Sequence, residues 1–211
     1  MSNIFLYGEK EIDYLKRVDP ALGAIIDKIG PIERPVIPDL FTALVHSIVG
    51  QQISSKAMNT VWRRFEERFP QITPTTLNKA SVEEIQQIGM SMRKATYIKE
   101  ATSKILLGEL NIDELYTLSE EEVIEKLTAL HGIGVWTAEM ILIFCMQRPN
   151  IMSYGDFAIR KGLRILYQLE KLDKEQFNNY KRRYSPYASV ASLYIWAVAS
   201  GKSGLKEDEN R

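Results

Sequence analysis

The 211-residue chain has very little cysteine and histidine. Its single cysteine, Cys145, excludes an internal disulfide, a zinc site of several cysteines and a four-cysteine iron–sulfur cluster. Only His46 and His131 add nitrogen ligands, so we expect no built-in transition-metal site. The composition therefore disfavours functions that depend on thiol redox chemistry or on a resident metal.

The chain also lacks an excess of charge, with 27 basic and 27 acidic residues. This balance hides runs of opposite sign. Residues 109–125 contain seven acidic side chains and no basic one, whereas residues 160–183 contain eight basic and three acidic side chains. Residues 93–104 contain four basic side chains and one acidic one. Such runs are usually solvated helix faces, but they also allow one positive face that suits a nucleic-acid backbone.

Long apolar runs and a leader peptide are absent as well. The longest uncharged stretch, residues 184–201, contains Pro186 and four serines and predicts a buried helix rather than a membrane span. The opening MSNIFLYGEKEI lacks the basic-then-apolar order of a secretory signal. We therefore expect no membrane association and a cytoplasmic location, or a nuclear one in a eukaryote.

Apolar residues recur with helical spacing along most of the chain, and no stretch alternates as a strand does. The pattern predicts an all-α fold. Ser81–Glu84 and Ser119–Glu122 have the spacing of capping boxes that begin helices. The predicted helices cover residues 40–49, 57–69, 81–88, 95–107, 119–130, 138–145, 156–167, 174–180 and 186–199. We expect one domain over residues 1–201, in which the proline-containing first forty residues wrap onto later helices, and a charged tail over 202–211.

The stretch LTALHGIGVWTA, residues 127–138, joins two predicted helices through Gly132, Ile133 and Gly134. Glycines permit a positive φ and remove side chains that would block a close approach. We expect Ile133 to point inward and pin the two helices together. The second helix then begins with N–H groups and a positive dipole end that suit an anion. The pattern is typical of a phosphate-binding helix-hairpin-helix, although a glycine-rich bend between two core helices has the same residues.

Asp156 follows Gly134 by 22 residues and starts a basic helix. Alone, it would be interpreted as a helix N-cap. The order of hairpin, short loop, aspartate and basic helix resembles the helix-hairpin-helix DNA glycosylase superfamily, and within it the 3-methyladenine DNA glycosylase II branch, from about residue 40 to residue 201. The resemblance implies two helical lobes, about 40–150 and 1–39 plus 151–201, with the active-site cleft between them.

Two further segments carry the resemblance. LVHSIVGQQIS, residues 44–54, is similar to the segment that enters the duplex, with Gln52 where the prototype bacterial enzyme has leucine. YSPYASVA followed by LYIW, residues 184–196, is similar to the late helix W-x-P-W/Y-R-S-x-A, with Ala188 in place of the arginine. Trp136 stands where bifunctional relatives have the lysine that forms a Schiff base. The resemblance therefore implies no lyase activity.

The resemblance also implies roles for individual residues. Asp156 is the catalytic residue, which stabilises the cationic sugar and orients or deprotonates water. The expected base pocket contains Trp136, Met140, Tyr187 and Trp196, although apolar helical spacing explains either tryptophan as a core residue. The expected DNA-binding residues are Gln52, Arg93, Lys94, Gly132, Ile133, Gly134 and Thr137. No cofactor or resident metal is implied, and a monovalent cation at the hairpin on DNA binding is left open.

The predicted function is that of a monofunctional DNA glycosylase. It would flip out alkylated purines of the 3-methyladenine and 7-methylguanine type and hydrolyse the N-glycosidic bond, leaving an abasic site. The predicted partner is double-stranded DNA that contains damaged bases, and the predicted state is a monomer. Three alternatives stay open: a glycosylase for hypoxanthine or oxidised bases, a non-catalytic helix-hairpin-helix DNA-binding protein, and a helical interaction protein without a DNA role.

Overall fold

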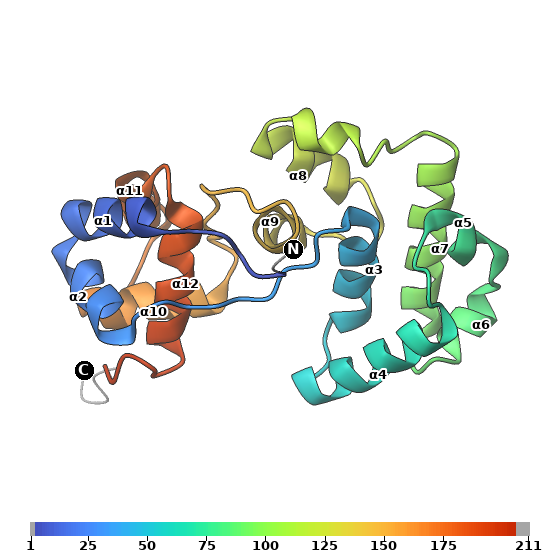
Figure 1. Cartoon of the computed structure of the whole chain (residues 1–211), viewed down its shortest axis with the longest axis horizontal. Helices are drawn as coiled ribbons and strands as arrows, with labels where there is room; N and C mark the ends of the chain where they lie inside the picture. Colours follow the sequence, from blue (N-terminus) through green and yellow to red (C-terminus); the bar gives the residue numbers. More distant parts are fainter. Residues whose placement is uncertain (1–2, 206–211) are drawn as a thin grey trace. The chain divides into compact units, whose positions relative to one another are not determined.

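The computed structural model describes residues 3–205, which fall into two compact units (Figure 1). Unit 1 consists of Met1–Val36 and Gln147–Arg211, and unit 2 consists of Ile37–Met146. Apart from one isolated bridge between Ile4 and Pro35, the regular structure in the described part of the chain is helical, which confirms the all-α prediction. Residues 206–211 of the predicted charged tail lie outside the described residues.

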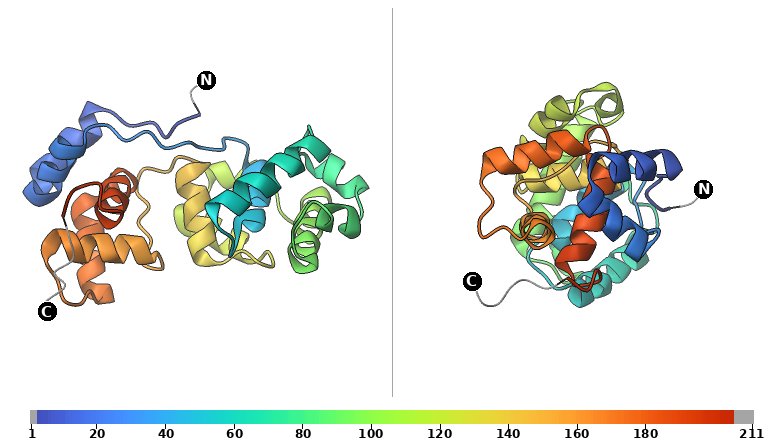
Figure 2. Two further views of the ribbon diagram at one scale, coloured as in Figure 1. Left: turned by 90° about the horizontal axis from the view of Figure 1, so that it is seen from below. Right: turned by 90° about the vertical axis from the view of Figure 1, so that its left-hand side faces the viewer.

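Unit 1 is built around α12, the helix predicted from the uncharged stretch near the end of the chain. Its helices are α1 (Glu9–Val18), α2 (Pro20–Ile29), α10 (Phe157–Tyr167), α11 (Lys174–Tyr184) and α12 (Ala188–Ala199). The α10 and α12 helices lie against each other (Figure 2). A Cβ atom on Gly162 of α10 would lie 2.3 Å from the Ile195 carbonyl oxygen of α12, so this close approach requires glycine. No helix in the described range combines the length and the apolar character needed to cross a bilayer.

The first forty residues contain two helices that the sequence analysis did not predict, α1 and α2. They pack on the later helices of unit 1 as expected, with α2 against α10 and α12 and α1 against α11. The overlooked signal is Asp19-Pro20, an N-cap residue followed by proline at the first helical position. The buried Asp19 carboxylate accepts hydrogen bonds from the Leu22 N–H (3.0 Å), the Tyr167 hydroxyl (2.6 Å) and the Arg183 guanidinium (2.8 Å).

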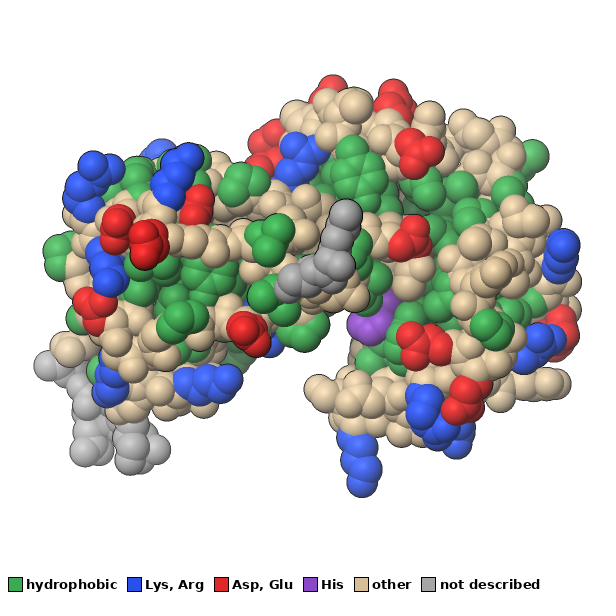
Figure 3. Space-filling view, in the orientation of Figure 1, with side chains coloured by type: hydrophobic (Ala, Val, Ile, Leu, Met, Phe, Trp, Pro, Cys, Tyr) green, Lys and Arg blue, Asp and Glu red, His purple; other side chains and the backbone are tan. Residues whose placement is uncertain are grey.

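Unit 2 packs its helices around α3, whose apolar residues are almost all buried. Its elements are α3 (Leu40–Gly50), α4 (Ser55–Arg68), α5 (Pro74–Lys79), α6 (Val82–Gln86), α7 (Met92–Leu106), the 3-10 helix η1 (Glu114–Thr117), α8 (Glu120–Thr128) and α9 (Val135–Phe144). Both predicted capping boxes are formed, at the starts of α6 and α8. The short α5 and η1 were not predicted. Acidic side chains gather over α8, whereas acidic and basic side chains lie side by side over α4 (Figure 3).

Candidate functional site

The two glycines of the hairpin between α8 and α9 differ in backbone conformation and in the space around them. Gly132 has φ 83°, and a Cβ atom there would lie 2.4 Å from Cδ2 of the Tyr97 ring. Glycine is therefore required at this position by both the backbone and the packing. Gly134 has φ −94°, and a Cβ atom there would meet no atom within 4 Å. Gly134 therefore does not use the positive φ that glycine permits, and the absence of its side chain leaves open space beside the hairpin.

The start of α9 lacks a side-chain cap because its N-cap residue is Gly134. By contrast, α7 and α8 begin at Ser91 and Ser119, whose hydroxyl oxygens accept from first-turn N–H groups. Ile133, between the two glycines, is buried in unit 2, as predicted. Thr137 is also buried, so its side chain is not placed for DNA contact and only its main chain lies at this helix end. An anion can therefore supply the acceptor that Gly134 lacks.

The turn after α3 lies beside the hairpin. The Gln51 side-chain Nε2 donates a hydrogen bond to the Gly132 carbonyl oxygen at 2.6 Å. The next residue, Gln52, is exposed and has φ 56°, in the left-handed region that residues with a Cβ atom rarely adopt. The structure thus brings together two of the predicted DNA-binding segments. Sequence analysis did not single out Gln51, although it lies inside the segment that carries the resemblance.

The two basic residues at the start of α7 have different surroundings. Arg93 is exposed in the first turn of the helix, where a cation opposes the helix dipole by about 0.3–1 kcal/mol. A bound phosphate would relieve this cost. Lys94 is half-buried, and its ammonium group donates to the carbonyl oxygens of Val49 (2.9 Å) and Gln51 (2.5 Å). The expectation that Lys94 is a simple phosphate contact is therefore corrected: its charge is directed into unit 2.

His131 lies immediately before the hairpin glycines and is joined to α7 by a side-chain hydrogen bond. Its Nδ1 atom is 2.8 Å from an oxygen of Glu100 on α7, and its ring is 6.2 Å from the Tyr97 ring. Sequence analysis identified neither contact, because the partners are about thirty residues apart in the chain. The hairpin is therefore attached to α7 by side chains as well as to the turn after α3.

Asp156 in unit 1 is the N-cap residue of α10, and its side chain is buried. Its Oδ1 atom accepts a hydrogen bond from the Ile159 N–H at 2.9 Å and another from the Trp196 indole Nε1–H at 3.2 Å. Both donors, together with the positive end of the α10 dipole, stabilise negative charge on the carboxylate. Trp196 was predicted as a wall of the base pocket. The structure gives it a further contact that directly orients the predicted catalytic group.

The loop that leads into Asp156 is fixed by aromatic contacts within unit 1. The Tyr154 ring meets Phe177 edge-on at 5.1 Å, and the guanidinium of Arg160 lies 5.4 Å from the centre of the same ring. The predicted basic helix therefore directs Arg160 toward a neighbouring ring of its own unit. These contacts restrict the conformations that the loop can give to Asp156.

The remaining predicted pocket residues occupy separate places. In unit 2, Trp136 is 48% exposed at the start of α9, and the half-buried Met140 lies one turn later on the same face. In unit 1, the Tyr187 ring packs against Tyr14 at 5.2 Å. Tyr187 is the N-cap residue of α12, in the same unit as Asp156, and its place in the base pocket stays a prediction.

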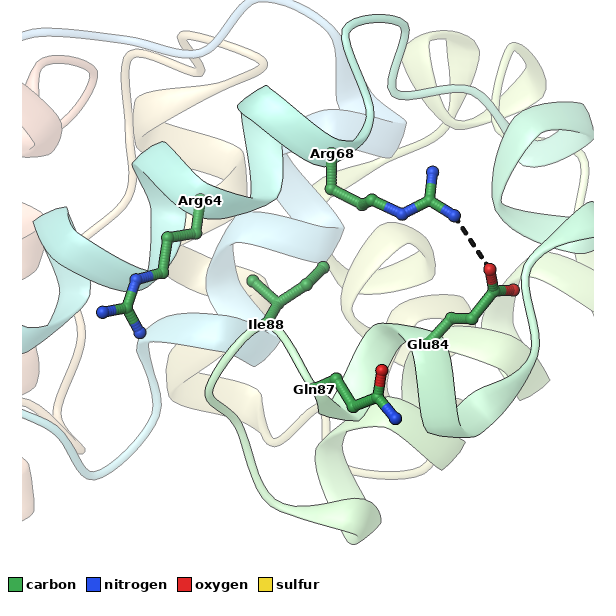
Figure 4. A pocket seen from close by; sticks show the side chains of 5 residues that line it. All are labelled: Arg64, Arg68, Glu84, Gln87 and Ile88. Carbon is green, nitrogen blue, oxygen red and sulfur yellow. Dashed lines mark hydrogen bonds and ion pairs between the residues drawn. The ribbon is translucent and has the colours of Figure 1, made fainter.

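A hollow of about 380 Å³ between α4 and α6 is lined by Arg64, Arg68, Glu84, Gln87 and Ile88 (Figure 4). An ion pair of 2.8 Å joins Arg68 to Glu84, and the Arg64 side chain points away from this pair. None of the residues predicted to bind DNA or a base lines the hollow. The candidate residues therefore form two groups, the hairpin segment within unit 2 and the Asp156 region within unit 1, and neither group includes this hollow.

Comparison with known proteins shows which protein family this chain belongs to. Residues 45–185 match the model of the HhH-GPD superfamily of base excision DNA repair proteins. The chain belongs to this superfamily, which confirms the resemblance inferred from the sequence.

Individual relatives narrow the comparison to one branch of that superfamily. The chain is 32% identical over 166 residues to DNA-3-methyladenine glycosylase 1 of Schizosaccharomyces pombe, with 75% of this chain and 72% of the relative covered. The DNA-3-methyladenine glycosidase structure from Bacillus halodurans superposes with a TM-score of 0.84 at 33% identity and covers 96% of this chain and 95% of that one. The S. pombe 3-methyladenine DNA glycosylase in complex with abasic DNA gives a TM-score of 0.79 at 28% identity, with 92% and 97% covered.

Proposed function

We propose that this protein is a DNA glycosylase that releases alkylated purines from duplex DNA and leaves an abasic site. The observation that carries the proposal is the buried Asp156 carboxylate, which begins α10 and is oriented by N–H donors from Ile159 and Trp196. The relatives named as DNA-3-methyladenine glycosylases support this substrate class.

The chemistry of alkylated purines fits a site with a single carboxylate. Alkylation at N3 or N7 gives the purine a positive charge, so the base departs without a general acid. The sugar then acquires the positive charge of an oxocarbenium ion. A fixed carboxylate stabilises that charge electrostatically and orients or deprotonates the attacking water. Asp156 would perform both tasks, and water is the co-reactant.

The hairpin segment would hold the DNA while the base leaves the stack. The main chain at Gly134 and the Arg93 guanidinium would bind phosphates, which position the duplex without reading its sequence. Extrusion of a base costs about a few kcal/mol, less for a damaged pair, and the exposed Gln52 would fill the gap that the base leaves. In this proposal the residues of unit 2 supply binding and extrusion.

Trp136 would bind the cationic base, and its presence in place of a lysine would exclude the lyase reaction. An exposed indole face attracts a positively charged purine by about 0.5–2 kcal/mol. Met140, one turn along α9, would extend this surface. Because Trp136 replaces the lysine of bifunctional relatives, the protein would hydrolyse the glycosidic bond without nicking the strand.

The test is base release from a panel of duplexes that contain 3-methyladenine, 7-methylguanine, hypoxanthine or 8-oxoguanine. We expect release of the two alkylated bases and an intact strand until alkali is added. Release of hypoxanthine or 8-oxoguanine alone would assign another substrate class. DNA binding without release of any of the four bases would support the non-catalytic alternative.

A further inference from the structure

Three segments of unit 2 are joined by a small set of hydrogen bonds. Gln51, at the end of α3, donates from its side chain to the Gly132 carbonyl oxygen in the hairpin at 2.6 Å. The main-chain carbonyl of the same residue accepts from the Lys94 ammonium at 2.5 Å. Gln51 is therefore connected both to the hairpin and to the first turn of α7.

The position of Lys94 is that of a helix cap rather than of a phosphate contact. Its second acceptor, the Val49 carbonyl at 2.9 Å, is one of the last carbonyls of α3, at the negative end of the helix dipole. Burial, together with the neighbouring Arg93, lowers the pKa of Lys94. A lysine that binds DNA from a solvated surface would not direct its ammonium at two main-chain carbonyls of its own unit.

The turn that Lys94 holds contains an unfavourable backbone conformation. Gln52 is exposed and left-handed at φ 56°, which costs about 1–2 kcal/mol for a residue with a Cβ atom. Such a conformation persists where its surroundings determine it. Here the bonds at Gln51 fix the residue immediately before it, so Gln52 is presented outward in one defined direction.

We propose that Lys94 is a positioning residue, which holds the Gln51–Gln52 turn in the shape that enters the duplex. The inference rests on the proposed function, because it needs a base that leaves the stack. A turn that is ordered before binding loses less conformational freedom when Gln52 occupies the gap. Lys94 thus acts on base extrusion through Gln51, and phosphate binding falls to Arg93 and the hairpin.

The experiment compares wild-type protein with Lys94→Met, which keeps the apolar stem and removes the donors. Three quantities are measured: single-turnover release of 3-methyladenine, fluorescence of 2-aminopurine placed beside the lesion as a report on extrusion, and the salt dependence of binding to undamaged duplex. We expect release and the extrusion signal to fall about tenfold. We expect the slope of log affinity against log salt to stay unchanged, because no phosphate contact is lost.

Lys99 on the same helix provides a matched control. Its ammonium donates to the carbonyls of Leu77 (3.2 Å), Asn78 (2.7 Å) and Ala80 (2.7 Å), none of which belongs to a predicted DNA-binding segment. Lys99→Met therefore removes the same kind of contact and tests for a general loss of stability. We expect it to lower the melting temperature while base release and extrusion stay close to wild type.

The outcomes separate this inference from the proposed function. A salt slope that is smaller by about one in Lys94→Met, with normal extrusion, would make Lys94 a phosphate contact and overturn the inference. Equal losses of release in both lysine variants would also overturn it. A wild type that releases no base but extrudes it in a Lys94-dependent way would refute the proposed reaction alone. If Lys94→Met melts below the assay temperature, Lys94→Gln, which keeps a shorter donor, is compared in the same assays.

Discussion

Asp156 combines two functions in one side chain. It caps α10 through the Ile159 N–H, and it presents a carboxylate held by the Trp196 indole. An asparagine preserves the cap, because Asn and Asp begin helices about equally well, but it removes the charge. The two functions are therefore separable by one nearly isosteric substitution.

We expect Asp156→Asn to lower single-turnover release of 3-methyladenine by at least 10²-fold, about 3 kcal/mol in the barrier, because charge stabilisation of the sugar is lost. The free energy of unfolding should fall by no more than about 1 kcal/mol. Affinity for damaged duplex should be kept or increased. Near-normal release by a folded variant would reduce Asp156 to a helix cap.

Trp196→Phe tests whether the indole orients the carboxylate. The variant keeps a half-buried ring and loses the Nε1–H donor, so we expect single-turnover release to fall about tenfold while the affinity for damaged DNA stays the same. The matched control is Tyr194→Phe, which removes a hydroxyl on the same helix that contacts Tyr7 and Gly30 and was not predicted for the site. An equal loss of release in Tyr194→Phe would contradict the assigned role of Trp196.

Trp136 allows a test by chemical trapping. A Schiff base requires an amine at the sugar, and this position has none. Sodium borohydride should therefore leave the protein uncoupled from a duplex that it has processed. Efficient covalent trapping would show that another amine attacks the sugar and would assign the protein to a bifunctional branch.

At the scale of elements, the hairpin allows binding to be separated from folding. Gly134 has extended backbone angles and open space around its Cβ direction, so Gly134→Val should fold. Its side chain would lie where a phosphate must approach the first turn of α9. We expect affinity for undamaged duplexes of any sequence to fall about tenfold or more, measured by fluorescence anisotropy. Unchanged affinity with a normal melting curve would show that the hairpin does not bind phosphate.

The elements that sequence analysis predicted are those with local signals. The α6 and α8 helices begin at capping boxes, and α10 begins at Asp156, because a few neighbouring side chains and N–H groups determine these starts. The α1 and α2 helices were missed because prolines around them indicated an irregular segment. Their apolar faces are stabilised by contacts with residues more than a hundred positions away.

In the candidate site, too, the features that the sequence predicted are local, and those that it did not predict depend on residues far apart in the chain. The hairpin glycines and Asp156 were identified because each lies in a short pattern with a local physical meaning. The inward direction of Lys94 and the bond from Trp196 to Asp156 depend on partners about 40 residues away. Side-chain direction across such separations is a property of packing, which residue types alone do not determine.

At the scale of the whole molecule, the free energy of unfolding should depend on pH in the alkaline range. Burial raises the pKa of the Cys145 thiol from its ordinary 9.0 to about 12. Burial and the neighbouring Cys145 raise the pKa of Tyr116 from 10.0 to about 12. Burial also raises the pKa of Tyr184 and of Tyr194 in unit 1. Buried hydroxyl and thiol groups in both units thus hold their protons longer in the folded state than in the unfolded state.

The unfolded chain releases these protons first, so stability is complete below about pH 9 and falls as the pH rises toward 12. The loss is up to about 1.4 kcal/mol per pH unit for each of the buried groups Cys145, Tyr184 and Tyr194, and less for Tyr116, whose exposed side chain is screened by solvent. Urea unfolding at pH 8, 9.5 and 11 measures it. In the unfolded chain the cysteine loses its proton at a lower pH than the tyrosines. Cys145→Ala should therefore make the free energy of unfolding fall less steeply between pH 9 and 10. A wild-type free energy of unfolding that is constant over this range would contradict the burial argument.

The division of the chain between the two units sets an order of assembly during synthesis. Domains fold as units while the ribosome extends the chain at about 5–20 residues per second. Unit 2 is one continuous segment, Ile37–Met146, whereas α1 and α2 must wait for α10, α11 and α12 before their apolar faces are covered. The whole segment of unit 2, including the hairpin, is therefore synthesised before Asp156. A polypeptide that terminates after Met146 would retain the DNA-binding segments and lack the proposed catalyst, so premature release would produce a competitor for lesions rather than a slow enzyme.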